Sequence, residues 1–418
     1  MCDVTSGATR ITKGDPAIRG CPQNKTCPGR GRMKPYDLMV LGAGASGLWA
    51  AMVAARRGKR VCVVDHGKKP GRKVLVAGGG KCNFTNRDME PHHFVCENPH
   101  FVKSAIARFT PWEIIAFLDA RGISWEEREL GRLFCKKSAA DIVSALKEAC
   151  RRSGVSFYLG QRITRLEKKE NFHLTLSQET VEAQNCLVAL GGPAWPQVGA
   201  TDFGHRIAKQ FGHAIVPARP ALVPFTLEKK SSFKELAGIA LPARLTAGGK
   251  SVTENLLFTH TGLSGPAALQ GSCNWKKGEA IAIDFLPQTP IDTLFDASGG
   301  KPMVKTVIGK HLPERLTRAI LPSKLASKQV AQLTRDQYDT LKKRIHNHLI
   351  TPSGTLGMKK AEATGGGVCT REISSKTMES KKTKGLYFAG EVLDVTGQLG
   401  GYNLHWAWAS GQAVGESV

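Results

Sequence analysis

Long apolar runs are missing from this sequence, and their absence excludes a membrane-spanning helix. No segment approaches the roughly 18 consecutive apolar residues that such a helix needs, although 41% of the residues are hydrophobic. The first 32 residues also lack the apolar core of a secretory signal. We therefore expect a protein of the cytoplasm.

Cysteines and histidines at the spacing of a metal site are missing as well. The eleven cysteines are an odd number, and several stand in apolar runs such as "RVCVVD" and "NCLVAL", which indicates reduced, buried thiols. Cys21 and Cys27 lie six residues apart. His346 and His348 are predicted to share a helix, where residues two apart do not face each other. We predict no metal site.

Acidic residues are few relative to basic ones. The chain has 59 Lys and Arg against 35 Asp and Glu, a net charge of +24, which can indicate a phosphate-bearing partner. The surplus is spread out, since residues 289–365 hold thirteen basic and six acidic residues and residues 366–418 hold five of each. No basic motif interleaved with aromatic residues appears. We expect the charge to serve an anionic cofactor or substrate, and nucleic acid is not the expected partner.

A strand, a glycine loop, a helix and a second strand follow one another near the start of the chain. The run "LMVL" leads into "GAGASG", an Ala-rich helix ends at Gly58, and "RVCVVD" forms a strand that ends at Asp65. An acidic residue about 20 positions past the glycines is placed to bind a ribose. This βαβ unit predicts a dinucleotide-binding site.

Each glycine of the loop has a predicted role. Gly42 permits a tight turn, Gly44 lets the backbone approach a pyrophosphate, and Gly47 allows the helix to pack closely on the strand. Ala45 and Ser46 complete the helix N-terminus, whose free N–H groups favour phosphates.

The predicted elements divide the chain into a discontinuous nucleotide-binding domain and an insertion. Residues 1–33 are polar and rich in Gly and Pro, so we interpret them as a disordered extension, or Met33 as the true start. After them, α/β patterns give way to short strands with Pro and Gly punctuation and then to helical patterns. The predicted segments are a nucleotide-binding domain at 34–215 and 366–418, a β-rich insertion at 216–288 with a return segment at 351–365, and a helical subdomain at 289–350.

Three motifs together resemble a known family. "GGGKCNFTN", "LFTHTGLSGPAAL" and "TMESKKTKGLYFAGEVLDVTGQLGGYNLHWAWASG" are similar to those of the BaiN/YhiN-like flavoproteins. The similarity extends from about residue 35 to the C-terminus. Members are predicted FAD-dependent oxidoreductases, some described as aminoacetone oxidases or bile-acid reductases. The resemblance implies an α/β fold, in which a discontinuous Rossmann-like FAD-binding domain carries an inserted β-barrel-like domain with a helical subdomain.

The resemblance also implies the cofactor contacts. The family's "GGGRCN" segment lies near the flavin; here Lys81 replaces Arg, which keeps the charge but loses the bidentate fork. Leu190 replaces the Thr of the family's "ATGG". Glu391 matches an acidic residue near the ribityl chain or pyrophosphate, Asn83 would donate hydrogen bonds, and the "GQLGGYNL" turn offers N–H groups for charge at the flavin N1/O2. The residues expected to bind FAD are Gly42, Gly44, Ala45, Ser46, Gly47, Asp65, His66, Arg72, Lys73, Gly79, Gly80, Lys81, Cys82, Asn83, Gly191, Gly192, Gly390, Glu391, Gly400, Gly401, Tyr402 and Asn403.

The catalytic groups are less clear from the sequence. His260, in "FTHTGLSGP", stands in a loop that would face the substrate and is a candidate general acid, although a structural role is favoured. Glu372 and Tyr402 are further candidates. Cys82 has no paired cysteine before Cys96, so we expect a packed or flavin-adjacent structural cysteine and not a redox-active one.

These features together predict an FAD-dependent oxidoreductase that transfers a hydride through the flavin N5 to or from a small organic substrate. Since only one GxGxxG motif is present, NAD(P)H would dock transiently, and oxygen is an equally open acceptor. One alternative is an RNA-associated flavoprotein of the tRNA-modifying type, which a basic groove at the flavin would support. Another is a flavin-binding protein without turnover. The sequence leaves the substrate and the oligomeric state open.

Overall fold

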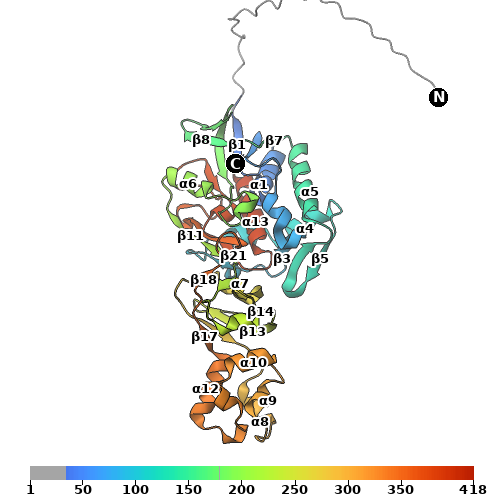
Figure 1. Ribbon diagram of the computed structural model, residues 1–418. Coiled ribbons are helices and arrows are strands. Elements are labelled where there is room, and N and C mark those ends of the chain that lie inside the picture. Colours follow the sequence, from blue (N-terminus) through green and yellow to red (C-terminus); the bar gives the residue numbers. More distant parts are fainter. Residues whose placement is uncertain (1–33, 178) are drawn as a thin grey trace, which may run out of the picture. The chain divides into compact units, whose positions relative to one another are not determined.

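The computed structural model describes residues 34–177 and 179–418, of which Pro35–Val418 form one compact unit (Figure 1). The predictions for residues 1–33, a disordered extension or a true start at Met33, lie outside the described residues. Within the described ranges, no helix is long and apolar enough to cross a membrane.

A seven-stranded sheet forms the centre of the first half of this unit. In sheet order its strands are β7 (Ser156–Leu159), β2 (Val61–Asp65), β1 (Tyr36–Leu41), β10 (Thr180–Val188), β9 (Phe172–Leu176) and β8 (Ile163–Lys168), and β20 (Leu386–Phe388) pairs with the end of β10. The pairs β7–β2, β2–β1, β1–β10 and β10–β20 are parallel. β9 pairs antiparallel with β10 and with β8, which adds an antiparallel ribbon. Leu38–Leu41 are fully buried, as expected for a central parallel strand.

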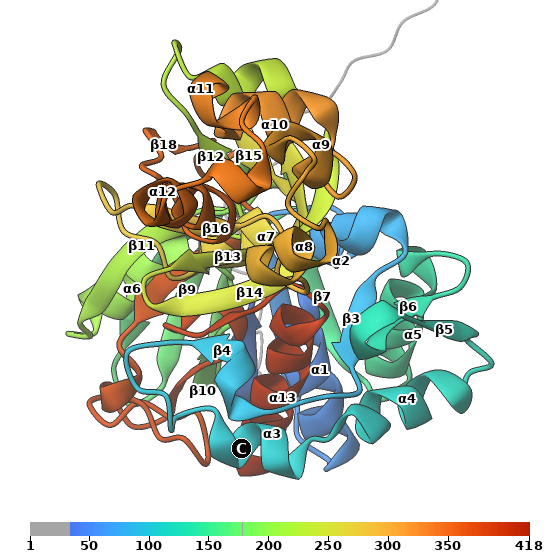
Figure 2. The same cartoon turned by 90° about the horizontal axis from the view of Figure 1, so that it is seen from below.

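Two helices far apart in the sequence pack side by side next to this sheet. They are α1 (Ala45–Arg56) and α13 (Tyr402–Ser417), seen together in Figure 2. A Cβ at Gly411 would lie 2.6 Å from the backbone oxygen of Ser46, and a Cβ at Gly415 would lie 2.6 Å from Val53 Cβ. The glycines of α13 are therefore what allow its close approach to α1.

A second, antiparallel sheet with its own apolar core is inserted between the parts of the first. Its order is β17 (His348–Ile350), β16 (Ile281–Asp284), β13 (Ala240–Ala247), β14 (Lys250–Phe258), β15 (Gly262–Ser264), β12 (Phe225–Thr226) and β18 (Gly354–Thr355), and α7 (Gly265–Gly271) packs on it. Arg132 donates to Glu254 of β14 (2.5 Å), which also accepts from Gln270 (2.6 Å). This ion pair joins the inserted sheet to the first half of the unit.

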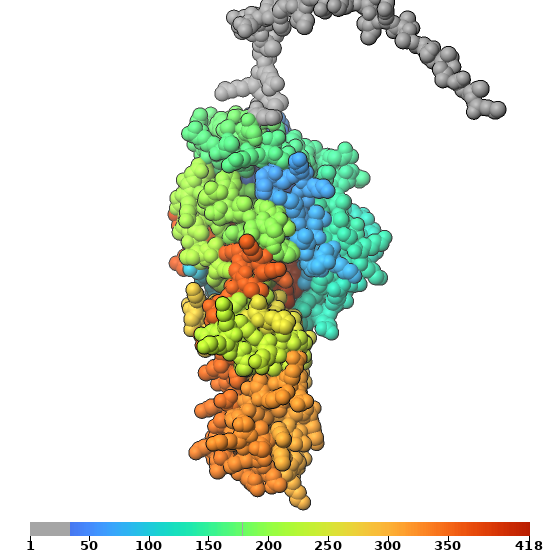
Figure 3. Space-filling view, viewed as in Figure 1, coloured from blue at the N-terminus to red at the C-terminus, as the bar shows by residue number. Residues whose placement is uncertain are grey.

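Five helices stand between β16 and β17. They are α8 (Ile291–Ala297), α9 (Val304–Ile308), α10 (Glu314–Ile320), α11 (Ser323–Ala326) and α12 (Arg335–His346), and their atoms lie beyond the inserted sheet in Figure 3. A capping box of Thr334 and Gln337 begins α12. The prediction that His346 and His348 share a helix was wrong, because α12 ends at His346 and His348 begins β17.

The remaining elements complete the first half. Their bounds are α2 (Arg72–Val76), α3 (Lys103–Arg108), α4 (Pro111–Asp119), α5 (Ala139–Arg152), α6 (Phe203–Gln210), β3 (Asn83–Asn86), β4 (Phe94–Val95), β5 (Trp125–Arg128), β6 (Arg132–Cys135) and β21 (Thr396–Gly397).

The chain enters and leaves the insertion along one antiparallel pair, β11 (Ile215–Ala221) and β19 (Ala363–Val368). Every residue of β19 is buried, and a Cβ at Gly366 would lie 2.4 Å from the backbone oxygen of Pro217. The predicted fold class is confirmed: a Rossmann-like α/β part carries an inserted β-sheet with a helical subdomain.

Candidate functional site

A groove of about 1100 Å³ lies at the carboxyl ends of the central parallel strands. Its lining begins with Gly42 after β1, with Asp65 at the end of β2 and with Ala189 after β10. Ligands of open α/β sheets bind at this edge, where the loops that follow the strands converge.

The loop before α1 uses its glycines in two ways. A Cβ at Gly42 would lie 2.4 Å from the Ala189 oxygen, and one at Gly47 would lie 2.0 Å from the Gly42 oxygen, so both positions exclude a side chain. A Cβ at Gly44 would meet no atom within 4 Å, and Gly44, Ala45 and Ser46 line the groove. Open space therefore adjoins the N–H groups of the α1 N-terminus, an arrangement that suits a pyrophosphate.

Asp65 stands at the ribose position of such a site. Its Oδ2 accepts from Ala43 N (2.8 Å) and its Oδ1 from Gly67 N (2.6 Å). Arg72 Nη2 lies 3.5 Å from Asp65 Oδ1 and 2.8 Å from His66 Nε2. Asp65, His66 and Arg72 all line the groove, so a fixed carboxylate and a cation are available there to the ribose and phosphates of a nucleotide.

A second ion pair marks the opposite part of the groove. Lys73 Nζ lies 2.6 Å from Glu391 Oε2, and Glu391 Oε1 accepts from Thr364 N (2.7 Å). The groove lining here includes Gly191 and Gly192, and a Cβ at Gly191 would meet only Glu391 Oε2, at 3.9 Å. The wall beside the ion pair at Gly191 is thus bare backbone.

The N-terminus of α13 also reaches the groove through Asn403 and Leu404. Gly401 has a φ of 97°, and a Cβ there would lie 2.3 Å from the Thr85 oxygen. The Asn403 side chain accepts from Gly397 N (2.9 Å) and donates to Gly397 O (2.8 Å). This turn is therefore rigid, and the positive end of the helix dipole favours negative charge on a ligand beside it.

The glycine run at 78–80 forms a tight turn, and Gly78 and Gly79 line the groove with their backbone. Gly78 and Gly79 have φ values of 57° and 66°, and both are exposed. A Cβ at Gly78 would lie 2.8 Å from Asn83 N, whereas one at Gly79 would meet nothing within 4 Å. A flat ligand can approach this wall closely.

The residues that follow this turn face the protein instead. Cys82 is fully buried, and burial raises the pKa of its thiol well above the usual value, with Cys135 adding to the effect. The Asn83 amide, oriented to donate to Leu133 O (3.0 Å) and Thr85 O (3.1 Å), accepts from Gly401 N (3.0 Å). Its donors are spent within the protein. Lys81 is exposed, and neither it nor Gly80 is part of the groove lining.

The three candidate catalytic residues all lie away from the groove lining. His260 is exposed in the loop before β15. Glu372 pairs with Lys382 (2.6 Å) and His213 (3.1 Å); burial alone would raise its pKa, but the hydrogen bonds from Lys382 and a backbone N–H lower it. Tyr402 is buried and stacks on His93 at 4.3 Å, and burial raises the pKa of its hydroxyl.

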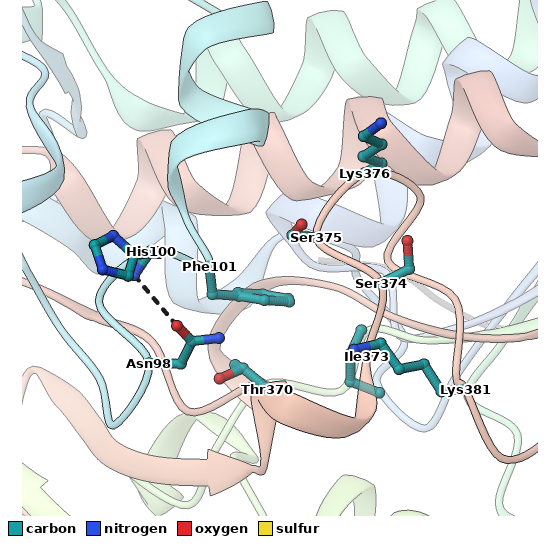
Figure 4. A pocket seen from close by; sticks show the side chains of 9 residues that line it. All are labelled: Asn98, His100, Phe101, Thr370, Ile373, Ser374, Ser375, Lys376 and Lys381. Carbon is teal, nitrogen blue, oxygen red and sulfur yellow. Dashed lines mark hydrogen bonds between the residues drawn. The ribbon is translucent and has the colours of Figure 1, made fainter.

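A smaller cavity of about 320 Å³ lies near Glu372 (Figure 4). Asn98, Thr370, Lys376 and Lys381 are among its lining residues, and it shares none with the groove. Among the described residues, no group of three His, Cys, Asp or Glu side chains is arranged to hold a metal ion.

Sequence reasoning missed several residues that line the groove. Arg162 belongs to the start of the β8–β9 ribbon, and Trp195 follows the glycine pair after β10 in a left-handed conformation with a φ of 67°. Glu362 stands directly before β19, whose glycine run was the sequence signal that could have indicated a groove wall here. Burial raises the pKa of Glu362, and Lys73 counteracts part of that rise.

The chain matches the sequence profile of the HI0933-like protein Rossmann domain over residues 36–417. It is 43% identical over 394 residues to the ribosomal RNA dihydrouridine synthase of Escherichia coli (strain K12), covering 92% of this chain and 98% of that protein. It is 44% identical over 391 residues to the protein of that name from Haemophilus influenzae, covering 91% and 98%. The 3-dehydro-bile acid delta(4,6)-reductase of Clostridium scindens is 31% identical over 412 residues, covering 91% and 98%.

Proposed function

Because the chain belongs to the HI0933-like Rossmann family of FAD-dependent oxidoreductases, we propose that it reduces the C5–C6 double bond of a uridine in ribosomal RNA. The observation that carries the proposal is the 43% identity, over nearly the whole of both chains, to a relative named for that product. Dihydrouridine is uridine with two hydrogens added across a bond that is conjugated to the C4 carbonyl. The reaction consumes one nicotinamide hydride, from NADH or NADPH, and one proton for each uridine.

The groove residues fit FAD. The open space at Gly44 and the bare backbone at Gly79 and Gly191 are cradles that a Cβ would fill, and the volume of about 1100 Å³ is above the usual range of about 300–1,000 Å³ for small-ligand pockets. When bound, FAD would supply a ring that accepts and donates a hydride.

The chain's own residues would then bind and orient. The α1 N-terminus and Gly44 would hold the pyrophosphate, and Asp65 the adenosine ribose. Glu391, fixed by Thr364 N and Lys73, would hold the ribityl chain. The first turn of α13 would favour negative charge at the pyrimidine side of the ring.

Charge supports RNA as the partner, which changes the expectation drawn from the sequence. Five cations line the groove against three carboxylates, and the chain as a whole carries +24. Such a surplus attracts a phosphate backbone without reading its sequence. The cations are Lys69, Arg72, Lys73, Arg162 and Arg206, and the carboxylates are Asp65, Glu362 and Glu391.

A small organic enone is the second candidate substrate. The 31% identity to a bile-acid delta(4,6)-reductase favours it, since double bonds at those positions are conjugated to a 3-keto group. Reduction of either substrate requires the same chemistry, which is the addition of a hydride and a proton across an activated C=C bond. They differ in the size and charge of the molecule that must reach the groove.

One experiment separates the two. The FAD-loaded protein is reduced without oxygen by NADPH or NADH and then mixed with unmodified ribosomal RNA transcript or with a steroid dienone. Absorbance follows the reoxidation of the flavin, and mass spectrometry of nucleosides measures dihydrouridine. We expect RNA to reoxidise the flavin and to gain dihydrouridine, whereas reoxidation by the dienone alone would replace RNA with the small substrate.

A further inference from the structure

Three carboxyl groups line the groove, and they differ in what holds them. Asp65 accepts from two backbone N–H groups, and Glu391 is held by Lys73 and a backbone N–H. The Glu362 carboxyl has no hydrogen bond or ion pair to any residue that the structure describes, and it is exposed to the groove. A carboxyl without a protein partner is free to contact a ligand.

The backbone beneath Glu362 is fixed on both sides. Glu362 N donates to Leu222 O (3.2 Å), and two residues later Thr364 N donates to Glu391 Oε1 (2.7 Å). Glu362 thus belongs to the part of the groove that holds Lys73 and Glu391, beside the glycine walls, and not to the ribose part at Asp65. Its side chain therefore lines the groove from a backbone that is held in place.

The surroundings favour the protonated form of this carboxyl. The groove walls partly desolvate the exposed Glu362 carboxyl and so raise its pKa above the usual value, whereas Lys73, on α2, opposes part of the rise. The Lys73 charge is shared with Glu391, its partner at 2.6 Å. A carboxyl with a raised pKa can hold a proton closer to neutral pH and release it to a substrate.

We propose that Glu362 donates the proton that completes the reduction, an inference that rests on the proposed function. One carbon of the C=C bond gains a hydride, whose two electrons originate in the nicotinamide donor. The electron pair of the C=C bond forms the second C–H bond with the Glu362 proton. The Glu362 O–H bond breaks, and the carboxylate that remains near Lys73 takes a new proton from water.

The other acids of the region are worse placed. Cys82 is fully buried, and Tyr402, His260 and Glu372 are not part of the groove lining. His66 does line it, but at the ribose part, where it is bonded to Arg72. Among the described residues, Glu362 alone combines an acid without a side-chain partner with a place in the groove lining near Lys73 and Glu391.

The test compares wild type with Glu362→Gln, Glu362→Asp and a matched surface control, Glu228→Gln. Glu228 is an exposed acid two residues after β12 and lies outside the groove lining. We would measure four quantities separately for each variant. They are the FAD content, the absorbance spectrum of bound FAD from pH 5 to 9, the rate of flavin reduction by NADPH, and the rate of flavin reoxidation by RNA or dienone. The dienone keeps the test informative if RNA is not the substrate.

We expect Glu362→Gln to keep its FAD and its reduction by NADPH, and to slow reoxidation by about 100-fold or more, the usual effect of a lost general acid. Wild-type reoxidation should fall as the pH rises through the Glu362 pKa, Glu362→Asp should keep a fall at a shifted pH, and Glu362→Gln should show none. Unchanged reoxidation in Glu362→Gln, or loss of FAD from it, would overturn the proposal. If neither substrate reoxidises the wild-type protein, the proposed function fails. The inference about Glu362 has its own test in the FAD spectrum. A pH-dependent shift of that spectrum that persists in Glu362→Gln would overturn the inference.

Discussion

Gly44 and Gly47, three residues apart at the start of α1, should respond differently to substitution. A side chain at Gly47 should lower stability, whereas one at Gly44 should weaken FAD binding. Gly47 is a packing position, since a Cβ there would lie 2.0 Å from the Gly42 oxygen and 3.1 Å from Val40 Cγ1. Gly44 is an open position with φ −84° and ψ −169°, a conformation that any residue adopts. We therefore compare Gly47→Ala with Gly44→Val.

Gly47→Ala should destabilise the protein. Overpacking costs up to about 3 kcal/mol, and Ala gains about 1 kcal/mol over Gly inside a helix, so the net loss is about 2 kcal/mol. At about 2–4 °C per kcal/mol for a large domain, the melting temperature of the FAD-free protein should fall by about 4–8 °C. Calorimetry measures this directly.

Gly44→Val should lower the unfolding free energy by about 1 kcal/mol or less. This small loss is expected because Gly44 is the N-cap of α1, where Val is less favourable than Gly. Its side chain would occupy the space beside the α1 N-terminus, so FAD affinity should fall at least about 100-fold, or about 2.7 kcal/mol. Flavin titration followed by absorbance measures the affinity. Full FAD binding by Gly44→Val, or wild-type melting of Gly47→Ala, would refute this account of the loop.

Three further substitutions test residues outside the groove. Cys82→Ser should keep FAD binding and reduce its flavin with NADPH at a rate within about threefold of wild type. The reason is that the Cys82 thiol is buried, has a raised pKa and is not part of the groove lining. Loss of turnover with FAD still bound would show instead that the thiol takes part in the reaction. Tyr402→Phe should leave turnover per bound FAD within about twofold in steady-state kinetics, since Tyr402 is buried and is not part of the groove lining. Glu372→Gln should lower the unfolding free energy by about 1–3 kcal/mol at pH 7, because Lys382 and buried His213 lose their partner. The pKa of Glu372 is lowered from 4.5 in the folded protein. The stability that Glu372 contributes should therefore be present above about pH 4.5 and be lost as the pH falls further, as urea unfolding of wild type and Glu372→Gln would show. A difference between the two proteins that stays the same at low pH would contradict the ion-pair explanation.

The sequence predicts those parts of the fold whose signals are local. The βαβ unit from β1 to Asp65 follows from an apolar run, a glycine loop and an Ala-rich helix within about 30 residues, and the structure has each element there. The resemblance to the BaiN/YhiN-like flavoproteins is confirmed by the family match. The error at His348 has a local cause too, since Asn347 ends α12 as its C-cap and Asn is a weaker stop signal than Gly or Pro.

The candidate site is harder to predict because its parts meet only through long-range pairing. Glu362 and Lys73 are 289 residues apart in sequence, with nearly the whole insertion between them. The pairing of β19 with β11 is what returns Glu362 to the groove. His260 is a candidate because its motif loop would face the substrate, and Glu372 is a further candidate. The sequence does not reveal that Glu372 is already paired with Lys382 and His213. Asn83 shows the same limit, because its amide bonds to the Gly401 turn.

A groove walled by backbone also bears on substrate choice. Gly79 and Gly191 offer no side chain that could distinguish a uracil from an enone, and a hydride with a proton from one carboxyl would serve both. Selectivity would then come from the side chains that the substrate meets elsewhere, in the rest of the groove lining or beyond it. The helical subdomain at 289–350 has eleven basic residues against five acidic ones, a surplus that would attract a polyanion and not a steroid. On this reasoning, RNA binding by the protein should weaken steeply as salt rises, whereas binding of a neutral dienone should not.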